Sequence, residues 1–243
     1  MARDATGPDA AELDALLADL ASRRSRIGSG RSLRRAAWKA TVRASYAAKR
    51  LLDVAGSGIG LVLLLPVFAA IGIAVKRSSP GPVFFSQIRV GQDGRFFRFW
   101  KFRTMRQDAE ALKASLAARN ESKDGVIFKM KDDPRITKVG KFLRRTSLDE
   151  LPQLWNVFVG DMSLVGPRPP VPSEVQEYTL EDRKRLNVKP GLTCLWQIGG
   201  RSDLSFREQV RLDKEYIQSP SVWKDLAILL KTIPAVISGK GAY

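Results

Sequence analysis

The sequence contains no histidine and a single cysteine, Cys194, among its 243 residues. The absence of imidazole excludes histidine bases, histidine-ligated metals and every Ser-His or Cys-His catalytic device. One cysteine can form neither an intramolecular disulfide nor a cysteine-cluster metal centre. Any catalysis must therefore rest on carboxylates, lysines, arginines and hydroxyls, and the metal that suits such groups is a hard cation such as Mg²⁺.

Acidic residues are also scarce, 25 against 41 basic ones, which leaves a formal net charge of +16. This excess implies an anionic partner, which can be nucleic acid, an acidic membrane face or a polyphosphate substrate. At 243 residues the chain is expected to hold one catalytic domain with appendages rather than two full domains.

The first 48 residues are expected to form a basic, partly helical N-terminal extension. Residues 9–20 place leucines at helical spacing. From Ala21 to Leu52 there is no acidic residue but ten basic ones, and Gly28 to Gly30 interrupt this stretch. A flexible basic arm and a helix lying on anionic lipid headgroups both fit this composition, and the apolar segment that follows favours the helix.

One apolar run, Val54–Val75, has 22 residues without a charge and is long enough to cross a membrane. Pro66 lies in its middle, where it removes one helical hydrogen bond and clashes with the preceding turn. Both flanks are basic, Lys49-Arg50 and Lys76-Arg77, so the positive-inside rule places both ends on the cytoplasmic side. We therefore expect residues 49–77 to form a re-entrant helix broken at Pro66 rather than a kinked full span.

Residues 78–243 are expected to form a cytoplasmic catalytic domain, and the predicted fold class is α+β and mostly helical. Apolar and polar residues alternate at 83–90 and 95–102, on either side of Gly91–Gly94, and this pattern predicts a β-hairpin. Turns are expected at 78–82 and 132–134, and a loop or short strand at 189–200. Helices, some of them amphipathic and interfacial, are expected at 107–119, 137–145, 172–188, 204–218 and 221–237, the last interrupted by Pro234.

The groups suited to phosphate chemistry gather in one segment, Leu143–Pro170 (LRRTSLDELPQLWNVFVGDMSLVGPRPP). Its adjacent carboxylates, Asp149 and Glu150, allow two interpretations. In the structural one, Ser147 and Glu150 form a capping box, and an apolar stripe follows at helical spacing. In the functional one, the arginines of the segment bind a diphosphate through paired hydrogen bonds.

The functional interpretation needs no base. Neighbouring carboxylates on a helix point about 100° apart, so one can attack phosphorus while the other holds a metal. A carboxylate is already ionised at neutral pH and can act directly as the nucleophile. Mg²⁺ bridging the phosphates would offset the repulsion between an anionic nucleophile and an anionic substrate.

Four motifs of the sequence resemble the bacterial sugar transferase family. They are Lys101–Met105 (KFRTM), Asp133–Thr137 (DPRIT), Arg144–Gln153 (RRTSLDELPQ) and Val165–Pro169 (VGPRP). Members of this family are monotopic polyprenyl-phosphate phosphoglycosyl transferases, and the match, from about Lys49 to Tyr243, is to the type that initiates exopolysaccharide synthesis. The resemblance thus implies an enzyme of the bacterial inner membrane, with its catalytic domain on the cytoplasmic side.

The resemblance also implies a ping-pong reaction. Asp149 would attack the β-phosphorus of a UDP-sugar, releasing UMP and leaving a sugar-phosphoryl aspartate, from which undecaprenyl phosphate takes the sugar phosphate. Glu150 would bind Mg²⁺, and Arg144 and Arg168 would hold phosphate or nucleotide. Further substrate-binding positions are expected at Arg145, Pro167, Pro169, Lys101, Arg103, Asp133 and Arg135.

Several of these positions keep a structural alternative. Lys101, Arg103, Asp133 and Arg135 could instead form surface salt bridges, and Asp161 could serve a turn or a cap. Trp196, Trp223 and the stripe at Leu226, Leu229, Leu230 and Ile233 could dock on lipid or pack in the core. The family breaks its hairpin at a Ser-Pro pair, whereas this chain has Leu65-Pro66 and lacks that hydroxyl.

The partners implied are a UDP-sugar, undecaprenyl phosphate and an anionic phospholipid bilayer, while self-association stays open. The sequence does not identify the sugar. A nucleic-acid-binding protein is the second class considered, but a long uncharged apolar segment and the lack of a helix-turn-helix or RNA-binding signature disfavour it. A non-catalytic membrane scaffold is the third.

Overall fold

The computed structural model describes residues 14, 38, 40–41, 43–109, 111–112, 116, 130, 132–200 and 204–238. The chain divides into two compact units, Met1–Ala48 and Lys49–Tyr243. The description below concerns the second unit. The helix expected at 9–20 and most of the one expected at 107–119 lie outside the described residues, and residues 107–109 and 111–112 of the latter form turns.

The apolar run forms two helices, Arg43–Leu63 and α2 (Leu65–Ser78), with a 61° bend between them. Pro66 occupies the first turn of α2, where its missing N–H costs no helical hydrogen bond. The break expected next to Pro66 is confirmed, and the Leu64 carbonyl accepts from the Phe68 amide across it at 2.8 Å. Among the described residues, no single helix has the length and hydropathy to cross a membrane, although this bent pair does.

The expected β-hairpin is confirmed. Strand β1 (Phe84–Val90) pairs antiparallel with β2 (Phe96–Phe102), from Phe84 opposite Phe102 to Val90 opposite Phe96. The connection is a single 3₁₀ turn, η1 (Gln92–Gly94), in which Asp93 and Gly94 have positive φ. These are residue types that tolerate the left-handed conformation a tight hairpin turn needs.

A second sheet pairs β3 (Ser163–Val165) with β4 (Gly191–Thr193) in parallel. The segment expected at 189–200 as a loop or short strand thus forms β4, followed by α8 (Leu195–Gly199). Just beyond β3 the chains approach so closely that a Cβ at Gly191 would overlap the Gly166 backbone. Glycine is therefore required at this crossing.

The remaining elements are helical. Helix α4 (Lys138–Arg145) is capped by Thr137, whose Oγ1 accepts from the Gly140 amide at 2.9 Å. The turn η3 (Leu148–Glu150) leads into α5 (Gln153–Val159). Helix α9 (Phe206–Gln218) begins with a Ser205–Glu208 capping box, and α10 (Val222–Ser238) follows it.

Two helix predictions need correction. The single helix expected at 172–188 is instead α6 (Pro172–Gln176), α7 (Leu180–Arg183) and the 3₁₀ turn η4 (Lys184–Asn187), because Thr179 and Asp182 form a capping box that starts a new helix. This charged segment is also partly buried, since Arg185 of η4 forms a buried ion pair with Asp213, 2.7 Å apart. Pro234 does not interrupt α10, which runs through it to Ser238.

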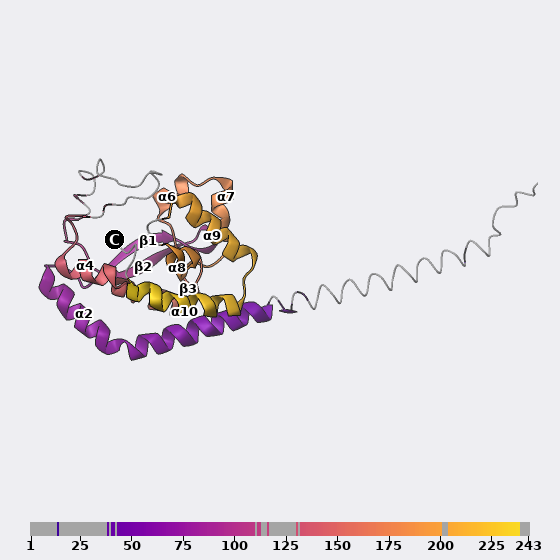
Figure 1. The fold of residues 1–243 in the computed structure, drawn as a ribbon, viewed down its shortest axis with the longest axis horizontal. Helices are drawn as coiled ribbons and strands as arrows, with labels where there is room; N and C mark the ends of the chain where they lie inside the picture. The colour runs from indigo at the N-terminus through magenta and orange to yellow at the C-terminus, as the bar shows by residue number, and fades with distance from the viewer. Residues whose placement is uncertain are drawn as a thin grey trace, which may run out of the picture. The chain divides into compact units, whose positions relative to one another are not determined.

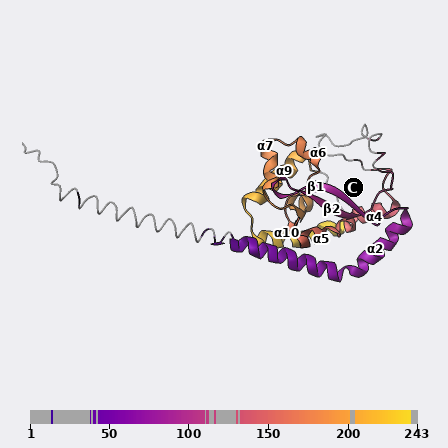
Figure 2. The ribbon, with the colours of Figure 1, turned by 180° about the vertical axis from the view of Figure 1, so that it is seen from behind.

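Two apolar clusters organise the fold. The first takes residues from β2, α5, β3, α9 and α10, and the second joins Ile71 and Val75 of α2 to Phe102 of β2 and Leu143 of α4. In both views the helix pair runs along the same edge of the domain as α10 (Figures 1 and 2). Trp196 is buried, which confirms core packing for it. Trp223, Leu230 and Ile233 of α10 are exposed, and lipid docking stays a prediction for them.

Candidate active site

The two carboxylates lie on a tight turn between α4 and α5. Ser147 has φ 56°, and its side chain makes no capping hydrogen bond to η3. The capping box of the structural interpretation, at Ser147 and Glu150, is therefore wrong, because a helix N-cap adopts extended backbone angles and Ser147 is left-handed. The turn instead reverses the chain directly after Arg144 and Arg145 and presents Asp149 toward β2.

Asp149 is buried, with 5% of its surface exposed. Lys101, from β2, places its ammonium 2.7 Å from Glu150 Oε1 and 3.7 Å from Asp149 Oδ2. Burial raises the pKa of Asp149, and the neighbouring Glu150 raises it further, while Lys101, Arg144 and Arg168 oppose both effects. The result is a desolvated carboxylate whose charge depends on the cations around it.

Two of the expected arginines flank this pair. Arg168 Nη1 lies 3.7 Å from Glu150 Oε1. Arg144 donates from Nε to Thr104 Oγ1 at 3.0 Å, and its burial lowers its pKa. Arg145 is exposed and lines a surface cavity of about 440 Å³ with Leu148 and the end of α10.

The structure adds Arg89 of β1, which strand alternation assigns to the solvent face. Its guanidinium lies over the Phe99 ring and donates to the Pro169 carbonyl at 2.9 Å. Burial, together with repulsion from Arg168, lowers the pKa of Arg89 to about 10. Within the described part of the chain, no carboxylate lies within 4.0 Å of the guanidinium of Arg89 or Arg144.

The site therefore carries four half-buried cations and only two carboxylates. Its cations are Lys101, Arg144, Arg168 and Arg89, and its carboxylates are Asp149 and Glu150. A buried charge without a partner is costly unless another group compensates it. An anion bound between these cations would provide that compensation.

The Gly-Pro-Arg-Pro turn is held on both sides. Pro167 and Pro169 are buried, and their carbonyls accept from the Gly191 amide at 2.8 Å and from Arg89 at 2.9 Å. A Cβ at Gly166 would lie 3.0 Å from the Gly191 nitrogen and closer still to the Lys189 carbonyl. The backbone of Arg168 is thus fixed between two anchored prolines.

Three expected substrate-binding residues lie in other contacts. Arg103 is buried and donates to the carbonyls of Ser79 at 2.7 Å and Pro80 at 2.6 Å, directly after α2. Asp133 and Arg135 form a buried ion pair, 2.6 Å apart, and the bonds from Arg135 lower the pKa of Asp133. The salt-bridge alternative is confirmed for this pair, although in the interior rather than on the surface.

Asp161 lies at the end of α5, exposed, and accepts from Asn156 Nδ2 at 3.2 Å. This contact matches the turn role that the sequence left open for it. For Lys101 the sequence predicts either substrate binding or a salt bridge. Lys101 forms salt bridges, but with the two candidate catalytic carboxylates, so it lies in the candidate site as well.

The donor set suits Mg²⁺. Among the described residues, no group of three or more His, Cys, Asp or Glu side chains gathers around one point. Magnesium in phosphoryl-transfer sites is commonly held by one or two carboxylates together with the substrate phosphates. Asp149 and Glu150 provide such a pair, and the ammonium of Lys101 already occupies a cation position beside Glu150 Oε1.

Comparisons with known proteins bear on this site. The model of the bacterial sugar transferase family matches residues 44–239. Galactosyl transferase CpsE of Streptococcus agalactiae is 51% identical over 196 residues, 80% of this chain and 43% of the relative. Undecaprenyl-phosphate galactose phosphotransferase of Salmonella typhimurium is 44% identical over 207 residues, 83% of this chain and 43% of the relative.

These two relatives are longer, and the chain spans less than half of their length. Exopolysaccharide production protein ExoY of Rhizobium meliloti is 43% identical over 199 residues, which cover 81% of this chain and 88% of ExoY. The family match includes both carboxylates, the Gly-Pro-Arg-Pro turn and the bent helix pair. The chain belongs to the bacterial sugar transferase family.

Proposed function

We propose that this chain transfers a sugar-1-phosphate from a UDP-sugar to undecaprenyl phosphate with release of UMP, as the first membrane step of exopolysaccharide or related glycoconjugate synthesis. The observation that carries this proposal is the buried Asp149, set beside Glu150 among cations that outnumber the carboxylates. The name of the Salmonella relative supports the acceptor, and the name of ExoY supports the product class.

The first half-reaction forms one bond and breaks one. A carboxylate oxygen of Asp149 attacks the β-phosphorus of the donor, and the bond from that phosphorus to the bridging oxygen breaks. UMP leaves with the electron pair, and a sugar-phosphoryl aspartate remains. In the second half, a phosphate oxygen of undecaprenyl phosphate attacks the same phosphorus, the bond to Asp149 breaks, and the carboxylate is regenerated.

The charged side chains around Asp149 bind the donor phosphates and keep the nucleophile ionised. Arg168 and Arg144 bind the phosphoryl oxygens, and paired guanidinium hydrogen bonds orient the diphosphate. Lys101 keeps Asp149 ionised in a site where burial favours the protonated acid. Glu150 would hold Mg²⁺ with the substrate phosphates, and the metal would neutralise negative charge between nucleophile and donor.

The proposed setting is the cytoplasmic face of a bacterial inner membrane. The bent helix pair has the length and composition of a re-entrant hairpin, and basic residues flank both of its ends. Helix α10, which carries exposed apolar side chains, lies along the same edge as the hairpin. A long-chain lipid phosphate could then reach the site without leaving the bilayer.

The test is nucleotide release by the purified full chain in lipid nanodiscs. A panel of UDP-glucose, UDP-galactose and UDP-N-acetylated sugars is supplied with Mg²⁺ and undecaprenyl phosphate. We expect UMP from at least one donor, loss of activity in Asp149→Asn and with excess EDTA, and normal activity in Asp161→Asn, a matched change in the same segment.

Two further readouts separate this reaction from its alternatives. Without acceptor, a stoichiometric burst of UMP and a phosphorus-containing adduct on Asp149 are expected by mass spectrometry. Release of UDP instead of UMP would mean direct glycosyl transfer and would overturn the aspartate mechanism. Full activity of Asp149→Asn would do the same.

A further inference from the structure

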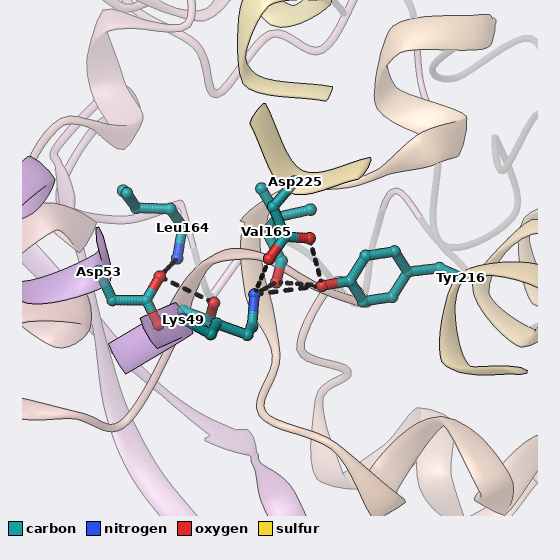
Figure 3. A network of polar contacts seen from close by, with 7 residues as sticks. Lys49, Asp53, Leu164, Val165, Tyr216 and Asp225 are labelled. Carbon is teal, nitrogen blue, oxygen red and sulfur yellow. Dashed lines mark hydrogen bonds and ion pairs between the residues drawn. The ribbon is translucent and has the colours of Figure 1, made fainter. Parts of the chain in front are cut away.

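Two side chains from distant parts of the chain, Lys49 and Tyr216, donate to the carbonyl of Val165, and Asp225 accepts from both of them (Figure 3). Lys49, on the helix Arg43–Leu63, donates to Val165 O at 3.0 Å, to Tyr216 Oη at 3.1 Å and to Asp225 Oδ2 at 2.6 Å. The Tyr216 hydroxyl, from α9, lies 2.8 Å from Asp225 Oδ1 and 3.1 Å from Val165 O, and shares its proton between them.

One turn further along the same helix, Asp53 adds a second contact. Its Oδ1 accepts from the Leu164 amide at 2.8 Å and from Ser163 Oγ at 3.0 Å. Positions 49 and 53 share one helical face, so both side chains reach β3 together. Asp53, Tyr216 and Asp225 are all buried, with exposed fractions of 5% or less.

These contacts add polar attachments to a short strand whose apolar side chains lie in the first apolar cluster. Strand β3 is only three residues long and has one neighbour, β4. Its last residue, Val165, directly precedes the turn that carries Arg168, and Arg168 faces Glu150. Any shift of β3 therefore moves the guanidinium that faces the catalytic carboxylates.

We propose that Lys49, Asp53, Tyr216 and Asp225 form a positioning clamp that sets Arg168 against Asp149 and Glu150. The helix that leads into the apolar hairpin is thereby part of the scaffold of the active site, and not an anchor alone. One test of this inference, the rate of UMP release, rests on the proposed function. The other, amide hydrogen exchange at β3 and the turn after it, does not depend on that function.

The polar and ionic character of the clamp side chains supports a positioning role. An apolar contact tolerates small sliding movements, whereas a charge pair with shared hydrogen bonds has one favourable geometry and strongly disfavours partial separation. Burial and the adjacent Asp225 also raise the pKa of the Tyr216 hydroxyl, so it stays protonated and able to donate. The Tyr216 hydroxyl thus remains a hydrogen-bond donor at neutral pH.

The chain offers a matched control on the same helix. Arg50 donates to Val157 O at 2.7 Å and Phe158 O at 2.8 Å, at the C-terminal end of α5. Arg50 therefore attaches the same helix to the same domain but makes no contact with β3. Arg50→Met removes a comparable attachment without touching the clamp.

The experiment compares Tyr216→Phe, Asp53→Ala, Asp53→Asn and Arg50→Met with wild type, as full chains in nanodiscs. Amide hydrogen exchange is measured over residues 163–169, and single-turnover UMP release is measured with a saturating donor. We expect Tyr216→Phe and Asp53→Ala to lose protection at 163–169 and to slow UMP release about 10- to 100-fold. Asp53→Asn keeps an acceptor oxygen and should retain most of the rate.

Arg50→Met should leave the protection of 163–169 unchanged and the rate within about twofold, with any added exchange near residue 157. Equal rate losses in Arg50→Met and Tyr216→Phe would overturn the clamp, because they would point to general loosening of the helix. Unchanged exchange at 163–169 in both clamp variants would overturn it as well. Wild type that releases no UMP but shows the expected exchange pattern would refute the proposed function and leave the clamp standing.

Discussion

At the scale of single residues, the site depends on one carboxylate that the fold desolvates. Burial raises the pKa of Asp149 and Lys101 is the largest opposing influence. A nucleophile must be ionised to attack, so the chemistry should fail as pH falls through this raised pKa. Lys101, the cation beside this carboxylate, is therefore expected to set the lowest pH at which the reaction proceeds.

This gives a pH prediction. Single-turnover UMP release, followed from acid to neutral pH, should fall on the acid side through a pKa above the ordinary value of aspartate, 3.8. Lys101→Met should move this acid limb to higher pH, since it removes the charge that favours the ionised form. The exposed substitution Lys138→Met is the control, and a limb that stays in place in Lys101→Met would contradict the assignment.

Stability should respond to Asp149 in the opposite direction to activity. A carboxyl whose pKa is higher in the folded than in the unfolded protein binds its proton more tightly when folded. Its contribution to stability therefore decreases as pH rises through the folded pKa. Asp149→Asn should show a Tm at neutral pH above that of wild type, and the difference should shrink as pH falls. Asp93→Asn, in the exposed hairpin turn, should show no such difference.

Arg89 is expected to bind the donor. Its half-buried guanidinium has no carboxylate within 4.0 Å in the described part of the chain, and it donates to the carbonyl of Pro169 beside Arg168. Arg89→Met should raise the KM for the UDP-sugar about 10-fold or more, equivalent to about 1.4 kcal/mol of binding. Arg98→Met, an exposed change on the paired strand, should leave KM unchanged. An unaltered KM in Arg89→Met would limit this residue to packing.

At the scale of elements, the structure separates residues that share one motif. Lys101 lies in β2, and Arg103 directly follows the end of that strand, two positions further along the chain. Lys101 reaches the carboxylates, whereas Arg103 reaches the carbonyls that follow α2. The same motif therefore contributes both to the site and to the attachment of the bent helix pair.

Arg103→Met tests this division. The substitution removes two short hydrogen bonds from a buried cation, and a loss of about 2–4 kcal/mol of stability is expected. Tm should fall and proteolysis near residues 79–81 should increase, while the donor KM stays within about twofold of wild type. Arg106→Met, on the exposed surface, is the control. A large increase in KM without a change in Tm would return Arg103 to the substrate site.

At the scale of the whole molecule, the distribution of charge and apolar surface supports the membrane setting proposed above. Basic residues flank both ends of the apolar run, and its two helices bend by 61°. Helix α10 lies along the same edge as this pair, and several of its apolar side chains are exposed, among them Trp223 at 81%. Both features favour entry and exit by one face.

Cysteine labelling provides the test of topology. Cys194 is buried, and burial raises the pKa of its thiol well above the usual value, so it should react poorly with maleimides. Ser45→Cys and Ser78→Cys, each in a Cys194→Ser background, should be labelled by an impermeant maleimide in inside-out vesicles and protected in right-side-out vesicles. Labelling of the two sites from opposite faces would exclude a re-entrant hairpin.

Local patterns in the sequence determined the local structure. Alternation around a glycine-rich turn fixed the β1–β2 hairpin, Pro66 marked the helix break to within two residues, and Thr137 marked the start of α4. The motifs around Asp149 and Arg168 located the candidate site. Each of these signals depends on hydrogen bonds or backbone angles within a few residues, which is why a single sequence reveals them.

Only the tertiary structure decided which charges are buried and with what they pair. Ser147 adopts a left-handed conformation instead of a cap, and Arg89 is drawn from an apparently exposed strand into the site. Lys49 meets Asp225 across 176 positions of sequence. Desolvation and long-range pairing depend on how elements pack together, and no periodicity along the chain records that packing.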